Sequence, residues 1–150
     1  MWAADLVERA SLRAGERVLD AACGTGVVAK VAAERVGSNG RVVGVDINSG
    51  MLRVARLPST AAGAPIEWHE ASVLALPFSD GAFDVVLCQF GLQFFSDRPT
   101  ALREIRRVLV ADGRVGGSVF GPKKRPARQS GSRLWRTTSG SSSRRRRWRH

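Results

Sequence analysis

The stretch Val18–Gly26 constrains the fold of this chain more than any other part of its sequence. It reads VLDAACGTG, an apolar β-branched run that leads into a glycine turn. The residues that follow, from Val27 to Val36, place their valines and alanines at helical spacing. A strand, a tight glycine turn and a helix N-terminus form a pocket in which backbone N–H groups approach a small ligand. The stretch therefore predicts a ligand-binding strand–turn–helix unit.

Strand-like and helix-like segments alternate along the first 120 residues. Apolar, β-branched runs predict strands at residues 17–20, 41–46, 66–69, 83–88 and 114–120. Apolar residues at helical spacing predict helices at residues 2–13, 27–36, 50–57 and 99–109. Because helical crossovers place parallel strands side by side, we expect an α/β fold with a mostly parallel, doubly wound sheet.

The composition changes abruptly after Phe120. The chain has a net charge of +11, yet residues 1–120 hold 13 basic and 13 acidic side chains. All of the excess positive charge lies in residues 121–150, which are rich in arginine, serine and glycine. Such a segment cannot bury enough apolar surface to fold. We therefore expect a single domain at residues 1–120 and a disordered basic tail at residues 121–150.

Cysteine usage and hydropathy narrow the class of protein. Cys23 and Cys88 are too few for a disulfide scaffold, and they lack the CxxC spacing of a metal site. No apolar run approaches the roughly 18 residues of a membrane span. The N-terminal residues lack the basic and then apolar pattern of a secretory signal. We therefore expect a cytoplasmic protein with reduced cysteines and no metal.

The glycine turn and a later acid fit a ligand that contains adenosine. Gly24–Ala29 satisfies the pattern G-x-G-x-x-G/A, and Asp46 follows Gly26 by about 20 residues, at the end of the second predicted strand. A carboxylate at this position can accept hydrogen bonds from both ribose hydroxyls. These features leave NAD and S-adenosyl-L-methionine both open as cofactors.

Asp20 distinguishes between the two cofactors. It ends the first predicted strand two residues before Ala22, the first small residue of the turn. A carboxylate there would repel the pyrophosphate of a dinucleotide at short range. S-adenosyl-L-methionine has no phosphate and presents an ammonium and a sulfonium, which a carboxylate attracts. Asp20 therefore favours S-adenosyl-L-methionine. It disfavours the alternative of an NAD-dependent oxidoreductase, for which the chain also has no tyrosine.

Four stretches of the chain together resemble one known family. They are, in chain order, VLDAACGTG, VVGVDINSGML, ALPFSDGAFDVVLCQFGLQFF and ALREIRRVLVADGRV. Over about residues 5–120 the chain is similar to the class I S-adenosylmethionine-dependent methyltransferases, especially the small-molecule branch that includes the quinone-biosynthesis type. The resemblance implies a Rossmann-like sheet with strand order 3-2-1-4-5 and methyl transfer from S-adenosyl-L-methionine to a small-molecule acceptor.

The resemblance also implies a set of cofactor-binding residues. They are Asp20, Ala22, Gly24, Gly26, Asp46, Ile47, Met51, Ser72, Val73 and Gln89. The members from the glycine turn, together with Gln89, would surround the methionine end of the cofactor, and Asp46 would hold the ribose. The others would lie around the adenine, where Ser72 replaces an aspartate that is common in the family and can accept one uncharged hydrogen bond. The pattern assigns no catalytic residue and no metal ligand.

Other polar side chains have simpler interpretations. Asp84 is expected to fix the end of its own strand rather than to take part in chemistry. His69 stands alone on a short strand and is expected to be a structural histidine. Arg103, Arg106 and Arg107 are expected to form the solvated face of one helix.

The basic tail allows two hypotheses. In the resembled family the sheet is completed by a further strand pair, but after Pro122 the sequence is dominated by arginine and serine, as in a GC-rich frame translated out of phase. We therefore expect a truncated or frameshifted chain that lacks the last strand pair and exposes the edge of its fifth strand. Alternatively, residues 123–149 bind nucleic acid without sequence preference through their arginines and tryptophans. The sequence does not define an oligomeric state.

Overall fold

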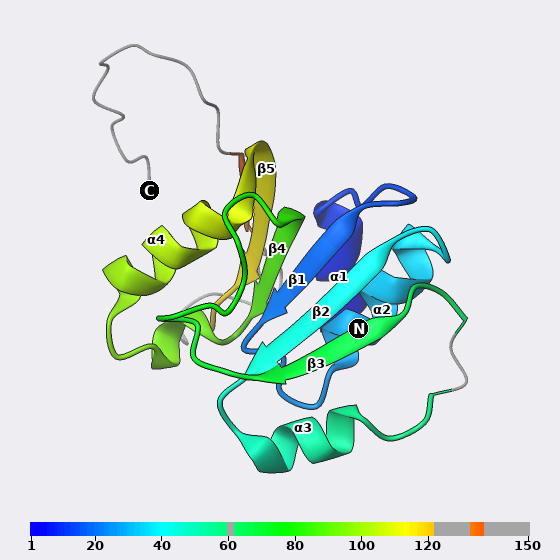
Figure 1. The fold of residues 1–150 in the computed structure, drawn as a ribbon, viewed down its shortest axis with the longest axis horizontal. Coiled ribbons are helices and arrows are strands. Elements are labelled where there is room, and N and C mark those ends of the chain that lie inside the picture. The colour runs from blue at the N-terminus through cyan, green and yellow to red at the C-terminus, as the bar shows by residue number, and fades with distance from the viewer. Residues whose placement is uncertain (60–61, 122–132, 137–150) are drawn as a thin grey trace.

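The computed structural model describes residues 1–59, 62–121 and 133–136. A six-stranded sheet lies at its centre, with the strand order β3-β2-β1-β4-β5-β6 (Figure 1). The strands are β1 (Arg17–Ala21), β2 (Arg41–Asp46), β3 (Ile66–Glu70), β4 (Phe83–Gln89), β5 (Leu109–Ser118) and β6 (Arg133–Arg136). The helices are α1 (Trp2–Arg9), α2 (Val27–Val36), α3 (Ser49–Ala55) and α4 (Arg98–Val108), with a 3-10 turn at Leu92–Phe94. The first five strands are parallel, which confirms the predicted Rossmann-like order 3-2-1-4-5.

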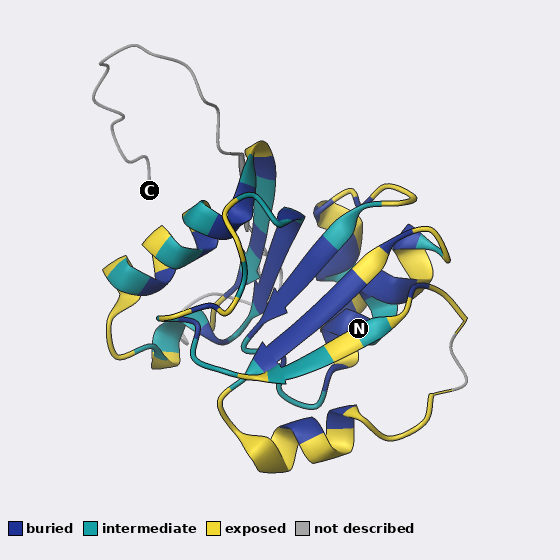
Figure 2. Ribbon diagram, viewed as in Figure 1, coloured by how far each residue is buried: buried dark blue, intermediate teal, exposed yellow. Residues whose placement is uncertain are grey.

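Two apolar cores lie on opposite faces of the sheet. Val18 packs with α1 and α2 on one face, whereas its neighbour Leu19 packs with α4 on the other. Figure 1 shows α1 and α2 behind the sheet and α4 to its left, beside β4 and β5. The inner strands are buried on both faces (Figure 2), which is why their sequences read as continuous apolar runs rather than as alternating ones.

An ion pair joins the amino ends of β1 and β4. The Asp84 carboxylate accepts hydrogen bonds from the Arg17 backbone N–H at 2.8 Å and from the Arg17 guanidinium at 2.9 and 3.1 Å. These bonds hold the pKa of Asp84 below its usual range. Asp84 therefore fixes its own strand end, as the sequence predicts, at the edge of the sheet opposite to the glycine turn.

The C-terminal side of the sheet differs from the sequence prediction. Residues 133–136 form β6, which pairs antiparallel with residues 114–117 of β5. The prediction that the whole tail is disordered is therefore wrong at this strand, and so is the prediction that the edge of β5 is exposed there; β6 is one strand and not the strand pair of the resembled family. Without β6, the edge of β5 would have N–H and C=O groups without partners. Leucine and tryptophan in the stretch RLWR favour a strand, but the average composition of the tail did not reveal this short segment. The rest of the predicted disordered and nucleic-acid-binding tail lies outside the described residues.

Candidate functional site

A cavity of about 250 Å³ opens where the glycine turn joins β1 to α2. It lies at the carboxyl end of β1, between β2 and β4, where the strand order reverses and α/β sheets bind their ligands. The residues that line it are Asp20, Ala22, Cys23, Gly24, Thr25, Val27, Val28, Met51 and Gln89. Five of the predicted cofactor-binding residues therefore meet in one cavity: Asp20, Ala22, Gly24, Met51 and Gln89.

Asp20 is a buried carboxylate with incomplete hydrogen bonding. The residue is 1% exposed, and its Oδ2 atom has no hydrogen-bond partner among the described residues. Burial raises the pKa of Asp20 to about 8; a hydrogen bond from the backbone of Ala29, in the first turn of α2, opposes this rise, and the charge of Asp46 adds to it. A buried acceptor without a partner requires an explanation, and a ligand with a donor group supplies one.

Gln89 supplies the complementary atom. Its Nε2 is buried and has no hydrogen-bond partner within the described part of the chain. Because Gln89 and Asp20 line the same cavity, an unsatisfied donor and an unsatisfied acceptor are available to one ligand. An amino-acid end, with an ammonium and a carboxylate, matches this pair of groups.

Asp46 braces the glycine turn. One oxygen of its carboxylate accepts the Gly24 N–H at 2.8 Å, and the other accepts the Asn48 N–H, also at 2.8 Å. Asp46 does not line the cavity, but each carboxylate oxygen retains a further lone pair for a ligand hydroxyl. The predicted carboxylate thus has a structural role that its position in the sequence did not reveal.

The two glycines of the turn have different roles. Gly24 has φ = 55°, and a Cβ built there would meet no described atom within 4 Å, in keeping with its place on the cavity wall. Gly26 has φ = 79°, and a Cβ built there would collide with the Trp68 ring, 2.8 Å from Cζ3. The structure therefore explains Gly26 by packing against β3 rather than by contact with the cavity.

Three predicted adenine contacts lie outside the cavity lining. Ile47 is 71% exposed, and the Ser72 hydroxyl accepts the Leu74 N–H at 3.1 Å. Val73 is buried in the core on the α4 face of the sheet, because it follows β3 at the point where the chain crosses towards β4. Contact of these residues with a ligand remains a prediction.

Two non-glycine residues beside the cavity adopt left-handed backbone conformations. Ala22 follows β1 with φ = 58°, and Phe90 follows β4 with φ = 57°. The two turns touch at Gly91, where a Cβ would lie 2.7 Å from the Ala22 Cβ and 3.0 Å from the Cys88 Sγ. Such strain persists only where the surrounding structure enforces it, and it concentrates at functional sites. The sequence patterns did not point to Phe90 and Gly91, although the glycine after the strand was a usable signal.

Cys23 also lines the cavity without having been predicted to do so. Burial raises the pKa of its thiol above the ordinary value, and the charges of Asp20 and Asp46 raise it further. These effects favour the neutral thiol over the nucleophilic thiolate.

Arg107 fixes the loop at residues 71–82, between β3 and β4. Its guanidinium donates to the backbone oxygens of Phe78 at 2.7 Å and Leu76 at 3.0 Å. It also pairs with Glu104 at 2.7 Å and Asp80 at 3.0 Å. The prediction that Arg107 belongs to a solvated helix face is wrong, because α4 turns this side chain onto the loop.

Three aromatic rings from distant parts of the sequence gather after the carboxyl end of β4, at Phe90. The rings of Phe90 and Phe120 stack with centroids 4.3 Å apart and planes 5° apart, and Trp2 meets Phe90 edge-on at 5.5 Å. The Gln93 side-chain oxygen accepts the Phe120 N–H at 3.1 Å and so holds the end of this cluster. Trp2 is 54% and Phe120 is 63% exposed, so the cluster presents an aromatic surface to solvent.

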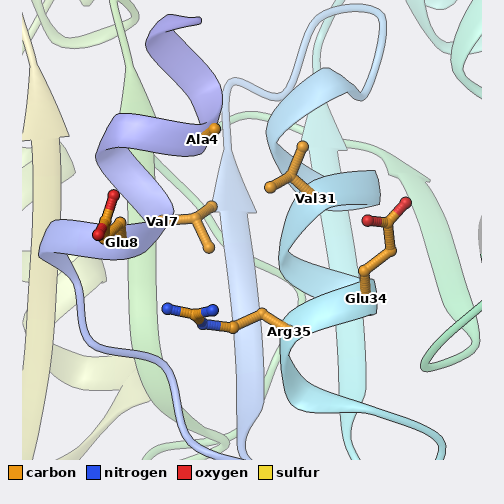
Figure 3. Close-up of a pocket in the computed structure, with 6 residues that line it drawn as sticks. All are labelled: Ala4, Val7, Glu8, Val31, Glu34 and Arg35. Carbon is orange, nitrogen blue, oxygen red and sulfur yellow. The ribbon is translucent and has the colours of Figure 1, made fainter.

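A second cavity, of about 400 Å³, lies between α1 and α2. Figure 3 shows Arg35 extending from α2 towards α1, with Val7 and Val31 facing the groove between the helices. Its lining includes no residue of the glycine turn and no strand end, so it is separate from the candidate site. In the part of the chain that the structure describes, there is no cluster of side chains able to hold a metal, and no helix is long and apolar enough to cross a membrane.

The strand order, the glycine turn and the cavity at its carboxyl edge define a Rossmann-like cofactor-binding domain. Residues 18–113 match the methyltransferase domain family. The ubiquinone/menaquinone biosynthesis C-methyltransferase of Hahella chejuensis is 43% identical over 117 residues, which cover 77% of this chain and 47% of that protein. The demethylmenaquinone methyltransferase of Thermus thermophilus is 41% identical over 126 residues, which cover 84% of this chain and 57% of that protein.

Solved structures agree with these sequence matches. The YcgJ protein of Bacillus subtilis has a TM-score of 0.69 at 30% identity and covers 82% of this chain and 53% of its own. A SAM-dependent methyltransferase of Aquifex aeolicus has a TM-score of 0.72 at 20% identity over 85% of this chain and 68% of its own, and shows the shared fold. The chain therefore belongs to the methyltransferase domain family, among the class I methyltransferases that use S-adenosyl-L-methionine as cofactor. This membership gives no support to an NAD-dependent oxidoreductase.

The chain spans about half the length of the curated relatives that it matches, at 47% and 57% of their residues.

Proposed function

We propose that this chain binds S-adenosyl-L-methionine in the cavity at the glycine turn and takes part in methyl transfer to a small-molecule acceptor. The observation that carries the proposal is the pair of unsatisfied buried atoms, Asp20 Oδ2 and Gln89 Nε2, on the wall of one cavity. The ammonium of the cofactor would donate to Asp20, and its carboxylate would accept from Gln89. Both contacts would satisfy groups that are costly to bury without a partner.

The remaining cofactor contacts follow from the same cavity. Asp46 would accept the ribose hydroxyls with the lone pairs that Gly24 and Asn48 leave free. Met51 lines the cavity while 45% exposed, and would cover one face of the adenine, with Ile47 beside it. Ser72 and Val73 would approach from the loop that follows β3.

The chain contributes to methyl transfer mainly by positioning. When bound, S-adenosyl-L-methionine supplies a methyl group on a sulfonium, whose leaving group is a neutral thioether. The residues of the glycine turn and Gln89 then need only to hold the donor so that the acceptor atom lies in line, which can supply most of the acceleration. We assign no general base.

We further propose that the acceptor is a small aromatic molecule. The cluster formed by Trp2, Phe90 and Phe120 presents an exposed aromatic surface at the turn that follows Gln89 in the chain, and a flat ring can stack there. The relatives in Hahella chejuensis and Thermus thermophilus are named for quinone methylation, which fits such an acceptor. A cytoplasmic location is part of the proposal, supported by the two free, buried cysteines.

Isothermal titration tests the cofactor assignment. The native chain should bind S-adenosyl-L-methionine and not NAD. Asp20→Asn should weaken that binding about 10-fold or more, because the ammonium of the cofactor favours the charged form of Asp20 and an amide cannot take on that charge. Asp112→Asn, a charge change on an exposed residue distant in sequence from the cavity lining, should leave the affinity unchanged. Binding of NAD without binding of S-adenosyl-L-methionine would overturn the proposal.

A further inference from the structure

Trp68 on the edge strand β3 occupies space that two glycines leave open. A Cβ built on Gly44 would lie 2.6 Å from the Trp68 Cζ3, and a Cβ built on Gly26 would lie 2.8 Å from the same atom. Real Cβ atoms essentially never make contacts this short, so a side chain at either position would have to displace the indole. One ring thus accounts for a glycine in β2 and a glycine in the turn.

The sheet register explains how an edge residue reaches the candidate site. Trp68 is the register partner of Gly44, and Gly44 is the register partner of Asp20. In a parallel sheet, register partners on adjacent strands place their side chains on the same face. Because Gly44 has no side chain, the indole can extend across β2 towards the turn that follows Asp20.

Other groups close the space around the indole. The position of a Gly44 Cβ lies 3.1 Å from the Cys23 Sγ, and the position of a Gly26 Cβ lies 3.2 Å from the Ala55 Cβ of α3. The Trp68 ring therefore lies between β2, the glycine turn and α3, and packs against the core that α1 and α2 form on this face of the sheet.

We propose that Trp68 is a positioning residue for the cofactor site, acting as a wedge that sets the place of the glycine turn relative to β2. The indole contacts the back of the turn at Gly26, while the opposite side of the turn, at Gly24, lines the cavity. Removing the ring lets the turn relax away from the geometry in which Gly24 donates to Asp46 and Asp20 faces the cavity. The expected effect on cofactor affinity rests on the proposed function, whereas the packing of Trp68 against the turn does not.

The test compares Trp68→Leu with Ile66→Ala. Ile66 lies two residues earlier on β3 and packs against the same core, but it does not appear among the nearest atoms to Gly26 or Gly44. Amide hydrogen exchange, followed by NMR, reports on the turn through the Gly24 N–H, bonded to Asp46, and the Gly26 N–H, bonded to the Cys23 oxygen at 2.9 Å. Trp68→Leu should speed exchange at both amides about 10-fold relative to Ile66→Ala. Equal exchange in the two variants would overturn the proposal.

Cofactor affinity gives a second readout. At a temperature where all variants are folded, Trp68→Leu should raise the Kd for S-adenosyl-L-methionine about 10-fold, and Ile66→Ala should leave it within about 2-fold. If the two variants bind equally well, Trp68 has no positioning role. If the native chain binds no S-adenosyl-L-methionine, the proposed function fails, and the exchange comparison still decides the role of Trp68.

A mutant cycle with Gly44→Ala identifies the contact itself. In the native background the added methyl group should displace the indole and weaken cofactor binding about 10-fold. In the Trp68→Leu background the methyl group no longer meets the indole and keeps only its close approach to the Cys23 Sγ, so its further effect should be less than about 2-fold. If Gly44→Ala and Trp68→Leu have additive effects on the free energy of cofactor binding, Trp68 does not act through its contact with Gly44.

Discussion

The glycine turn and the loop at residues 71–82 both leave the carboxyl edge of the sheet, but different forces hold them. The turn is held mainly by close packing, with left-handed glycines and the Trp68 ring behind Gly26, and the Asp46 carboxylate adds one hydrogen bond from the Gly24 N–H. The loop is held by hydrogen bonds from a residue far away in the sequence: the Arg107 guanidinium on α4 donates to two carbonyls and one carboxylate of the loop. A steric support tolerates almost no added volume, whereas a hydrogen-bonded support can lose one bond at a time. The variants below test this difference, in order of expected effect.

Gly26→Ala should have the largest effect. The substitution combines a left-handed φ of 79° with a collision against Trp68, and we expect a loss of about 2–5 kcal/mol in the free energy of unfolding. Gly15→Ala is the matched control, because Gly15 has φ = 83° but a Cβ there would meet no described atom within 4 Å. The control should lose about 1 kcal/mol in urea denaturation. Similar losses for the two variants would mean that the turn is not sterically supported.

Asp20 should make stability depend on pH. Because burial raises its pKa to about 8, the folded chain retains a proton that the unfolded chain releases near pH 4, so this group destabilises the fold as pH rises from 4 to 8. The native chain should therefore lose stability relative to Asp20→Asn by about 1.4 kcal/mol per pH unit, or about 2–3 kcal/mol between pH 5 and pH 7. Thermal unfolding of both proteins across this range measures the effect. A difference independent of pH would show that Asp20 is ionised in the fold.

Arg107→Ala should destabilise the loop at residues 71–82 by a smaller amount. Its partly exposed guanidinium bonds Glu104, Asp80 and two loop carbonyls, and we expect a loss of about 1–3 kcal/mol. Hydrogen exchange should become faster at two loop amides that bond to α4, Leu76 N–H to the Glu104 carboxylate and Gly81 N–H to the Arg107 backbone oxygen. Arg103→Ala, on the same helix, removes an exposed bond to Thr100 and should cost less than about 0.5 kcal/mol. Equal losses would contradict the assignment of a loop-fixing role to Arg107.

Ala22→Gly should have the smallest effect, and in the opposite direction. Glycine adopts φ = 58° without the strain that alanine carries, so the variant should gain about 0.5–1 kcal/mol, less the lost contact with Gly91. Ala21→Gly, one residue earlier within β1, should instead lose stability in the same denaturation experiment. A loss at Ala22 would show that packing against Gly91 outweighs backbone strain.

The sequence predicted the glycine turn and its neighbouring strands well, because residues that are close together in the sequence determine them. Glycines in the sequence predict the turn between β1 and α2. Asp20 and Asp46 each lie at or near the end of an apolar run that predicts a strand. The helix at residues 27–36 and the strand at residues 41–46 have the predicted bounds. The fifth strand begins at Leu109 rather than Arg114, since Leu109 pairs with Phe83 before a register shift.

The other features depend on contacts between distant residues. Nothing near Arg107 in the sequence shows that its guanidinium reaches Leu76 and Phe78, and a row of three arginines reads more simply as a solvated face. The role of Trp68 required the register of three strands, which periodicity does not give. The strand β6 was hidden because four residues contribute little to the average composition of a 30-residue tail.

The two left-handed residues, Ala22 and Phe90, bear on the order in which this domain folds. Each strained turn is held in place by the other across Gly91, so neither has its support until β1 and β4 are paired. That pairing joins segments separated by more than 60 residues. Contacts of such long range form late, because closing the loop costs conformational entropy before the contacts that it allows can stabilise the fold. The cavity is therefore expected to be among the last parts of the domain to form, so that a nascent or partly folded chain has most of its helices before it has a place for a ligand.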